Sequence, residues 1–274
     1  MPRKTNKYLS IMNAEKVTNH IVKWLKEYAL NAGVKGFVVG ISGGIDSAVT
    51  STLCARTGLE VLCLEMPIHQ AESQVSRALN HIDWLKENYP KVSLTQVNIS
   101  PVFDALINAL PTVENEEERF MSLANTRARL RMTTLYYFAA LEKLLVAGTG
   151  NKVEDFGVGF FTKYGDGGVD LSPIADLMKS EVYKLAAYLG VNEEIIKAAP
   201  TDGLWGDDRT DEDQIGASYD ELEWAMAQIE LGYNVDDLDN RQKEVLQIYN
   251  KLHRANQHKM QPIPVCQIAD NLKS

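Results

Sequence analysis

The sequence has little of several features that define large classes of proteins. Among its 274 residues only three are cysteines, Cys54, Cys63 and Cys266, and they form no CxxC pair and no metal-binding spacing. Their odd number argues against a secreted protein held together by disulfides. No apolar run approaches the roughly 18 residues of a membrane span, and the basic start MPRKTNKYLS lacks the apolar segment of a signal peptide. We therefore expect a globular protein of the cytoplasm, with no membrane partner.

Positive charge is also scarce. The chain has 28 Lys and Arg residues against 37 Asp and Glu residues, a formal net charge of −9. A protein that binds nucleic acid over its whole surface is normally basic, so we expect no nucleic-acid partner. An acidic protein can still bind an anion where its site is locally cationic or bridged by a metal ion. Because there is no internal repeat and no low-complexity linker, we expect one domain over residues 1–274.

Two kinds of apolar segment alternate along the chain. Short uninterrupted runs predict strands that are buried on both faces, at 36–41, 60–66, 92–99 and 144–151. Helical spacing and capping residues predict helices at 13–32, 46–57, 70–88, 115–143, 173–189, 218–231 and 237–257. This alternation is typical of the α/β class with a doubly wound parallel sheet flanked by helices. Ligands of such folds bind at the carboxyl ends of the strands.

One helix start and one irregular segment are predicted from local signals alone. Ser172 and Pro173 stand as N-cap and first helical residue, so they set the predicted start of the helix at 173–189. The preceding segment, 157–172, is too rich in glycine to form a regular helix.

The most informative stretch is GISGGIDS, which joins a predicted buried strand to a predicted helix. It resembles a phosphate-binding loop, yet no lysine stands where a Walker A loop places one to hold the β and γ phosphates. Backbone N–H groups at a helix N-terminus can still bind an anion, and the glycines allow close approach. Asp46 would repel a phosphate directly, but it is well suited to hold a Mg²⁺ ion that bridges to the phosphate oxygens.

The SGGxDS pattern after a buried strand resembles the PP-loop of the ATP pyrophosphatases, which are adenine nucleotide alpha-hydrolase-like and Rossmann-like in fold. The resemblance implies that ATP is cleaved between its α and β phosphates, so that the loop holds the departing pyrophosphate. Other members of this superfamily, such as tRNA thiolases and GMP synthetase, are alternatives. A thiolase should have reactive cysteines and a basic face, and neither is visible. An ATP-binding sensor without turnover is the alternative from a different class.

Further segments of the chain resemble the NAD synthetase family. These segments are GTGNKVEDFGVGFFTKYGDGGVDLSPIADLMKSEVYKLA at 148–187, PTDGLWGDDRTDEDQIGASYDELE at 200–223, and the HK pair near the C-terminus. Between Glu154 and Phe160 the chain has one residue more than some relatives. The resemblance implies a ligase that amidates deamido-NAD (nicotinic acid adenine dinucleotide) with ATP and ammonia, and that forms homodimers.

The family resemblance also implies roles for individual residues. The positions that would hold the ATP phosphates are Gly40, Ile41, Ser42, Gly43, Gly44, Ile45, Asp46 and Ser47, and the further positions that would bind ATP are Thr149, Lys179 and Thr201. The positions that would bind deamido-NAD are Arg129, Lys163, Asp170, His258 and Lys259. Asp46 and Glu154 would be the Mg²⁺ ligands. We expect Asp46 and Lys179 to act in catalysis, with Asp170 as a candidate to assist the attack of ammonia.

The nitrogen source can be argued from the place of the loop in the chain. Relatives that use glutamine have a large glutaminase domain before the synthetase part, whereas here SGGIDS begins at Ser42 after a single predicted helix. No cysteine precedes the loop, so a cysteine nucleophile of that kind is absent there as well. The sequence therefore predicts free ammonia as the direct substrate and no glutaminase domain.

Overall fold

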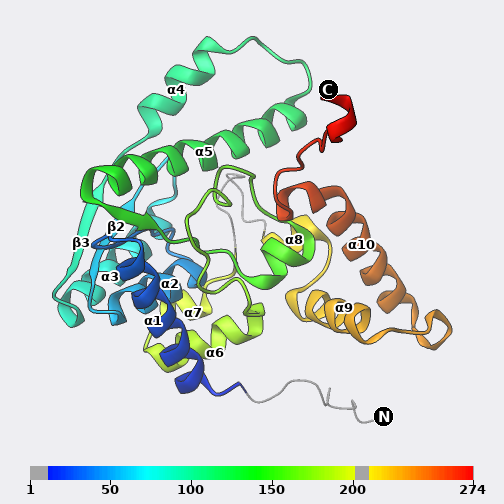
Figure 1. The fold of residues 1–274 in the computed structure, drawn as a ribbon, viewed down its shortest axis with the longest axis horizontal. Coiled ribbons are helices and arrows are strands. Elements are labelled where there is room, and N and C mark those ends of the chain that lie inside the picture. Colours follow the sequence, from blue (N-terminus) through cyan, green and yellow to red (C-terminus); the bar gives the residue numbers. More distant parts are fainter. Residues whose placement is uncertain (1–11, 201–209, 274) are drawn as a thin grey trace.

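A four-stranded parallel sheet forms the centre of the protein (Figure 1). The computed structural model of the chain describes residues 12–200 and 210–273. The strands are β1 (Gly36–Gly40), β2 (Glu60–Glu65), β3 (Val92–Gln96) and β4 (Leu144–Val146). Their order is β3-β2-β1-β4, and all neighbouring pairs are parallel. The predicted α/β fold is confirmed, although each strand ends earlier than its apolar run predicts.

Helices cover both faces of the sheet and extend beyond it. They are α1 (Ala14–Asn31), α2 (Ile45–Arg56), α3 (Glu72–Asn88), α4 (Ser100–Ala109), α5 (Glu116–Glu142), α6 (Lys179–Leu189), α7 (Glu193–Lys197), α8 (Asp211–Ile215), α9 (Tyr219–Leu231) and α10 (Asn240–Met260). A π-helix, η1 (Val153–Val158), and two 3₁₀ turns, η2 (Val235–Asp237) and η3 (Asp270–Leu272), complete the elements of the described residues. None of the helices within 12–200 and 210–273 is long and apolar enough to span a membrane.

Side-chain caps explain why several helices begin where the sequence predicts. The side chain of Asn13 accepts a hydrogen bond from the N–H of Lys16 at 2.9 Å, and that of Asn115 accepts from two N–H groups at the start of α5. Ser218 caps α9 by accepting from the N–H of Glu221. These oxygens pair with N–H groups that lack a partner within the helix.

The predicted start of the helix at 173–189 is wrong, because α6 begins only at Lys179. Residues 171–177 instead follow the segment after β4: the N–H of Gly148 donates to the carbonyl of Leu171, and that of Lys152 donates to Leu177. Ile174 in this segment is fully buried in the core. Burial and these pairings therefore override the local Ser-Pro signal. Helix α4 was not predicted from the sequence.

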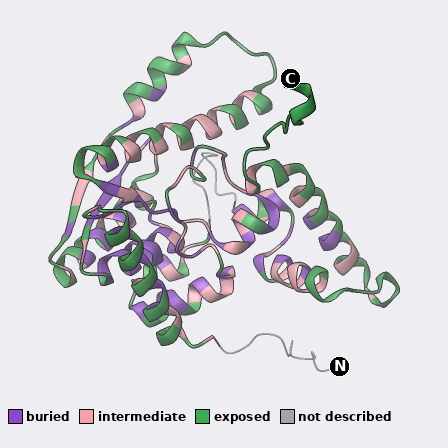
Figure 2. Cartoon of the chain, viewed as in Figure 1, coloured by how far each residue is buried: buried purple, intermediate pink, exposed green. Residues whose placement is uncertain are grey.

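The apolar residues form two layers on the sheet, because successive strand residues point to opposite faces. Phe37, Val39 and Cys63 lie in one cluster with residues of α1, α2, α3 and α6. Val38 and Leu62 lie in the other cluster, with residues of α4 and α5. Figure 2 shows this arrangement as buried segments around the sheet and largely exposed outer faces of α4 and α5. The crossover helices thus place the loops after β1 and β4 at the same edge.

A third apolar cluster lies away from the sheet. It joins η1 to α9 and α10 through residues such as Val153, Leu222 and Val245. In Figure 1, α9 and α10 stand on the right of the molecule, in yellow to red, opposite the labelled strands β2 and β3. This cluster fixes η1 between the sheet and the C-terminal helices, and η1 contains one of the predicted metal ligands.

A buried histidine makes the stability of the first layer depend on pH. His81 on α3 is 1% exposed, and its Nε2 lies 3.0 Å from the hydroxyl of Ser51 on α2. Since Ser51 donates its proton to the carbonyl of Ala48, its oxygen accepts, so Nε2 carries the histidine proton. Nδ1 is buried without a hydrogen-bond partner. Burial lowers the pKa of His81 from 6.5 to about 4, because the charged ring would lose its hydration.

We expect the free energy of unfolding to decrease by about 2 kcal/mol between pH 7 and pH 5 because of His81 alone. Below pH 6.5 the unfolded chain binds a proton on this ring, whereas the folded protein binds it only near pH 4. Urea unfolding at both pH values measures the decrease. The variant His81→Leu should lose this part of the pH dependence, and His20→Leu, at an exposed histidine, is the control. An equal pH dependence in the wild type and His81→Leu would contradict the assignment.

Candidate active site at the carboxyl ends of β1 and β4

The loop between β1 and α2 presents backbone N–H groups to an open cavity. Gly44 is the N-cap of α2 and makes no side-chain cap hydrogen bond, so the first N–H groups of the helix have no side-chain acceptor from the cap. Ser47 holds the loop in shape, because its hydroxyl accepts a hydrogen bond from the N–H of Ser42 and donates one to the carbonyl of Gly44. A helix N-terminus of this form is suited to bind the oxygens of a phosphate.

The position of this loop follows from the strand order. In the order β3-β2-β1-β4, the chain turns from one side of β1 to the other, so β1 and β4 lie at the point where the winding direction reverses. Crevices that bind ligands in open α/β sheets lie outside the carboxyl ends of strands at such a point. Asp46 follows β1, whereas Thr149 and Glu154 follow β4, so the predicted residues approach one another from two adjacent strands.

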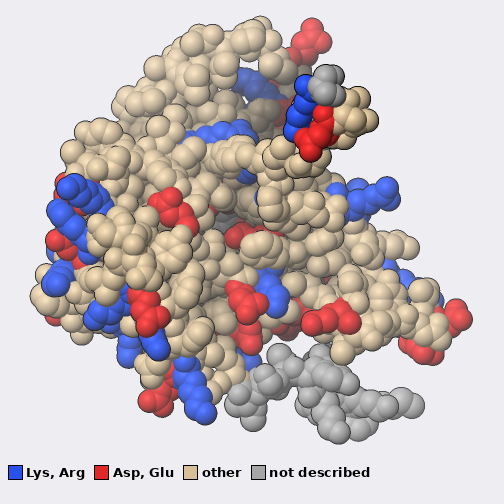
Figure 3. Space-filling view, viewed as in Figure 1, with Lys and Arg blue, Asp and Glu red and all other residues tan. Residues whose placement is uncertain are grey.

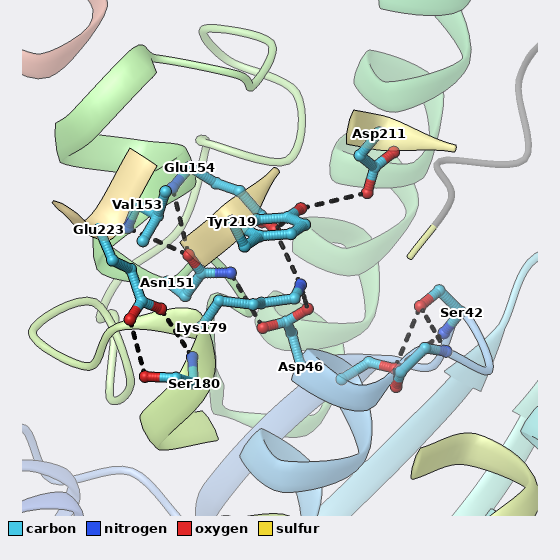
Figure 4. Close-up of polar contacts among 12 residues, drawn as sticks. Ser42, Asp46, Asn151, Val153, Glu154, Lys179, Ser180, Asp211, Tyr219 and Glu223 are labelled. Atoms are coloured by element: carbon cyan, nitrogen blue, oxygen red, sulfur yellow. Dashed lines mark hydrogen bonds and ion pairs between the residues drawn. The ribbon is translucent and has the colours of Figure 1, made fainter. Parts of the chain in front are cut away.

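Three predicted residues meet in one buried ion cluster (Figure 4). The ammonium group of Lys179, at the start of α6, lies 2.6 Å from Asp46 Oδ2 and 2.8 Å from Glu154 Oε1. The Lys179 side chain is 3% exposed, and the two carboxylates are 18% and 16% exposed. In sequence these residues are separated by up to 133 positions, yet one lysine nitrogen joins them.

The electrostatics of the cluster favour the ionised forms of Lys179 and Glu154. Burial alone would lower the pKa of Lys179, but the charges of Asp46 and Glu154 outweigh it and raise that pKa. Burial would likewise raise the pKa of Glu154, yet the charge of Lys179 and hydrogen bonds from Lys179 and Tyr219 lower it overall. For Asp46, burial raises the pKa against the opposing charge of Lys179. One ammonium group between two carboxylates leaves an excess of one negative charge.

Two residues that sequence reasoning did not single out hold this cluster in place. The side-chain amide of Asn151 donates to Asp46 Oδ1 at 3.0 Å, and its carbonyl oxygen accepts from the N–H groups of Val153 and Glu154. The hydroxyl of Tyr219 on α9 donates to Glu154 Oε1 at 2.6 Å, and the lysine ammonium lies 4.8 Å from the centre of its ring. An Asn at the end of the predicted strand at 144–151 was the available signal for Asn151.

The loop and the ion cluster form part of the wall of one cavity of about 610 Å³. That volume lies within the range of pockets that bind small organic ligands. Every predicted residue from Gly40 to Ser47 lines it, and so do Thr149, Glu154, Lys179 and Lys259. Arg131 on α5, which was not predicted, adds a guanidinium group to the wall, where burial lowers its pKa to about 10. The wall therefore combines backbone donors, carboxylates and four cationic side chains, which are Arg77, Arg131, Lys179 and Lys259.

Four of the five residues predicted to bind the dinucleotide lie together, but only Lys259 among them lines the cavity. Its ammonium group donates to the carbonyls of Gly159 and Phe161. The ammonium of Lys163 donates to the carbonyl of His258 at 2.6 Å, and Arg129 donates to the carbonyl of Lys163 at 3.3 Å. These contacts join α5 and α10 through the glycine-rich segment, with Arg129, Lys163 and His258 outside the lining of the cavity.

Asp170 and Thr201 stand apart from this arrangement. Asp170 Oδ2 accepts from the N–H of Val146 at 2.8 Å, and its Oδ1 accepts from the hydroxyl of Tyr136 at 3.0 Å. Both oxygens of the carboxylate are thus bound to the protein, and Asp170 does not line the cavity. Thr201 lies outside the described residues.

The predicted metal site consists of two carboxylates. Among residues 12–200 and 210–273, no group of three or more His, Cys, Asp or Glu side chains could hold a metal ion. Asp46 and Glu154 nevertheless fit a Mg²⁺ ion in kind, because they direct carboxylate oxygens to one point that a cation already occupies. Mg²⁺ in enzymes that act on nucleotides is typically held by one or two carboxylates, with substrate phosphates and water completing its shell.

The fold and this cavity define a nucleotide-binding α/β protein with a phosphate loop that lacks a lysine. Its family follows from comparison with known proteins. The NAD synthase family model matches residues 17–263, and the chain belongs to that family. An NH(3)-dependent NAD(+) synthetase from Carboxydothermus hydrogenoformans is 37% identical over 254 residues, which cover 90% of this chain and 96% of that protein.

Two solved structures are similar over nearly the whole chain. The NMN synthetase from Francisella tularensis has a TM-score of 0.80 and 30% identity, covering 94% of this chain and 100% of that one. The NH3-dependent NAD synthetase from Campylobacter jejuni subsp. jejuni has a TM-score of 0.75 and 29% identity, covering 93% and 100%. The similarity to a PP-loop enzyme inferred from SGGIDS is therefore confirmed at the level of the family and the fold.

Gly43 offers a direct test of the phosphate loop. Its φ is +80°, and a Cβ atom there would lie 2.6 Å from the carbonyl oxygen of Gln74. We expect Gly43→Ala to lose about 1–2 kcal/mol of stability from the backbone conformation alone. The forced movement of the loop should also weaken ATP binding roughly tenfold or more, the equivalent of about 1.4 kcal/mol. Urea unfolding and calorimetric titration with ATP measure the two effects.

Gly58 provides the matched control. Its φ is +72°, but a Cβ atom there would meet nothing within 4 Å. Gly58→Ala should therefore lose a similar amount of stability from its backbone conformation, and it should bind ATP as the wild type does. If Gly43→Ala also kept wild-type affinity for ATP, the loop would not be the phosphate site.

Proposed function

We propose that the protein is an ammonia-dependent NAD synthetase, a ligase that amidates deamido-NAD to NAD and converts ATP to AMP and pyrophosphate. Membership of the NAD synthase family supports the reaction class. The observation that carries the proposal is the lysine-free loop from Gly40 to Ser47, at the mouth of a cavity that also contains Lys179. Such a loop suits the binding of a departing pyrophosphate better than transfer of the γ phosphate.

The reaction proceeds in two steps. A nicotinate carboxylate oxygen bonds to the α-phosphorus of ATP while the bond from that phosphorus to the bridging oxygen breaks, which releases pyrophosphate. Ammonia then bonds to the activated carbonyl carbon, AMP leaves with the oxygen, and the new amide loses a proton. The role of the protein is to position the reactants and to neutralise charge. The N–H groups of the loop and Lys179 would bind the phosphates as negative charge shifts to the leaving group.

A magnesium ion held by Asp46 and Glu154 would supply further neutralisation of the phosphate charge when bound. Lys259 is the predicted dinucleotide-binding residue that lies closest to this chemistry, since it lines the cavity. We retain Arg129, Lys163, Asp170 and His258 as predicted binding residues, with Asp170 as the candidate that assists the attack of ammonia. We likewise retain the predictions of a single domain and of a cytoplasmic location. Basic and acidic side chains are interspersed on the face that Figure 3 draws, and we also retain the prediction of no nucleic-acid partner.

A mononucleotide substrate is the second candidate. The solved structure with a TM-score of 0.80 is that of an NMN synthetase. The corresponding nicotinate mononucleotide carries the same reacting carboxylate, so the same two steps would apply to it. The length of the substrate that the cavity accepts distinguishes the two candidates.

We expect the purified protein to form NAD and AMP from ATP, Mg²⁺, deamido-NAD and ammonium chloride. Chromatography of the nucleotides measures both products and the ratio of kcat/KM for deamido-NAD and nicotinate mononucleotide. Replacement of ammonium by glutamine should give little product, because ammonia is the predicted nitrogen donor. ADP and orthophosphate as products would exclude the proposal, and a higher kcat/KM for the mononucleotide would favour the second candidate.

A homodimer is part of the proposed function. Large apolar side chains are exposed along α4, the segment after it and α5, and they are Val102, Leu106, Leu110, Val113, Met121, Tyr137 and Leu141. A series of this kind on one pair of helices is typical of an interface between subunits. Covering it with a second copy of the chain would remove these side chains from water.

The double variant Val102→Glu/Leu106→Glu should therefore sediment as a monomer at concentrations where the wild type is a dimer, because burying two carboxylates in an apolar interface is unfavourable. Analytical ultracentrifugation measures the state of both proteins. Leu30→Glu, at an exposed leucine on α1, is the control and should remain dimeric. A monomeric wild type, or a variant that stays dimeric, would refute this interface.

A further inference from the structure

Lys179 occupies the position where a metal ion would have to bind. Its ammonium nitrogen lies within 2.8 Å of one oxygen of Asp46 and one oxygen of Glu154. The second oxygen of Asp46 already accepts from Asn151, and the Glu154 oxygen also accepts from Tyr219. These two carboxylates are the pair to which the proposed function assigns magnesium. A divalent ion that binds at Asp46 Oδ2 and Glu154 Oε1 would thus need the oxygens that Lys179 contacts.

Simultaneous binding of both cations at these oxygens is unfavourable. A divalent ion in contact with the two carboxylates would lie only a few ångströms from the ammonium group, where like charges repel strongly in a poorly hydrated site. The negative charge of two carboxylates is also too small to neutralise three positive charges. Lys179 must therefore withdraw before the ion can bind both Asp46 and Glu154.

Withdrawal of Lys179 requires another anion. Its side chain is 3% exposed, so leaving the carboxylates without a new partner would strand a buried charge. The ring of Tyr219 lies on one side of the ammonium group, at 4.8 Å. The cavity lies beside it, together with the phosphate loop from Gly40 to Ser47. Phosphate oxygens bound at that loop are anions that an ammonium group can bind with charge-assisted hydrogen bonds.

We propose that Lys179 is an internal counter-cation that excludes a divalent ion from Asp46 and Glu154 until the phosphates of a bound nucleotide draw its ammonium group away. The inference rests on the proposed function for the identity of the nucleotide, but not for the competition between lysine and metal. It gives Lys179 two successive partners: the carboxylates before a nucleotide binds and the phosphates afterwards. Metal binding then follows nucleotide binding.

The test measures binding of Mn²⁺ alone, without nucleotide, to the full-length protein by electron paramagnetic resonance. Lys179→Gln keeps hydrogen-bond donors but removes the charge, so it should bind Mn²⁺ at least tenfold more tightly than the wild type. In a matching thermal scan, saturating Mn²⁺ should raise the Tm of Lys179→Gln by roughly 5 °C or more and leave that of the wild type almost unchanged. Lys179→Arg, which keeps the positive charge, should show no gain.

Lys184→Gln is the matched control, since it removes the same charge from an exposed position on the same helix. It should bind Mn²⁺ as weakly as the wild type does. Equal Mn²⁺ affinity of the wild type and Lys179→Gln, whether both are tight or both are weak, would overturn the proposal. An increase in Mn²⁺ affinity in Lys184→Gln as large as that in Lys179→Gln would also overturn the proposal, because loss of any positive charge would then explain the effect.

If Lys179→Gln does not fold, the wild type decides the question. Tight, saturable binding of Mn²⁺ to the wild type without nucleotide overturns the proposal. The proposal is supported if the wild type shows no such binding and a protein-bound Mn²⁺ signal appears only after a non-hydrolysable ATP analogue is added. None of these measurements uses deamido-NAD or turnover, so failure of the amidation assay would refute the proposed function while leaving the competition to be judged on its own result.

Discussion

The contact of one buried ammonium group with two carboxylates is the interaction on which the site depends. Lys179, Asp46 and Glu154 come from the starts of α6, α2 and η1, so this contact joins three separate segments of the fold. Removing one member of a buried ionic cluster leaves the others without compensation, which is strongly destabilising. The same charges that hold these segments together are the charges available to a nucleotide and its metal ion. Stability and function are therefore linked at this point of the molecule.

The sheet provides the frame for this contact, and the C-terminal helices close it. Strands β1 and β4 are adjacent and parallel, so the segments that follow them emerge at one edge. The third apolar cluster then fixes η1 against α9 and α10. This packing brings Tyr219 to the ion cluster of Lys179, Asp46 and Glu154, and it brings Lys259 to the cavity wall. Each layer of the fold thus contributes a side chain to the site: the sheet loops contribute Asp46, and the separate helical cluster contributes Tyr219.

Much of the fold could be predicted from the sequence because its signals are local. A strand buried on both faces is an uninterrupted apolar run, as at 36–41, and the side chain of Asn13 accepts from one N–H group only three residues away. Among the site residues, SGGIDS could be recognised for the same reason. Tyr219 could not, because its role depends on a contact with Glu154, 65 positions earlier. The wrong helix start at Pro173 has a related cause, since pairing with the segment after β4 outweighs a valid local signal.

The π-helix at Val153–Val158 has a consequence for how chains of this kind can vary in length. A π-turn contains one residue more than an α-turn, so the gain or loss of a single codon there changes only the local winding. Glu154 lies in the first turn of this helix, which ends at Gly159, a residue with a φ of +67°. An insertion can thus be absorbed within one turn, so the segments on either side can keep their places when the length of this one changes.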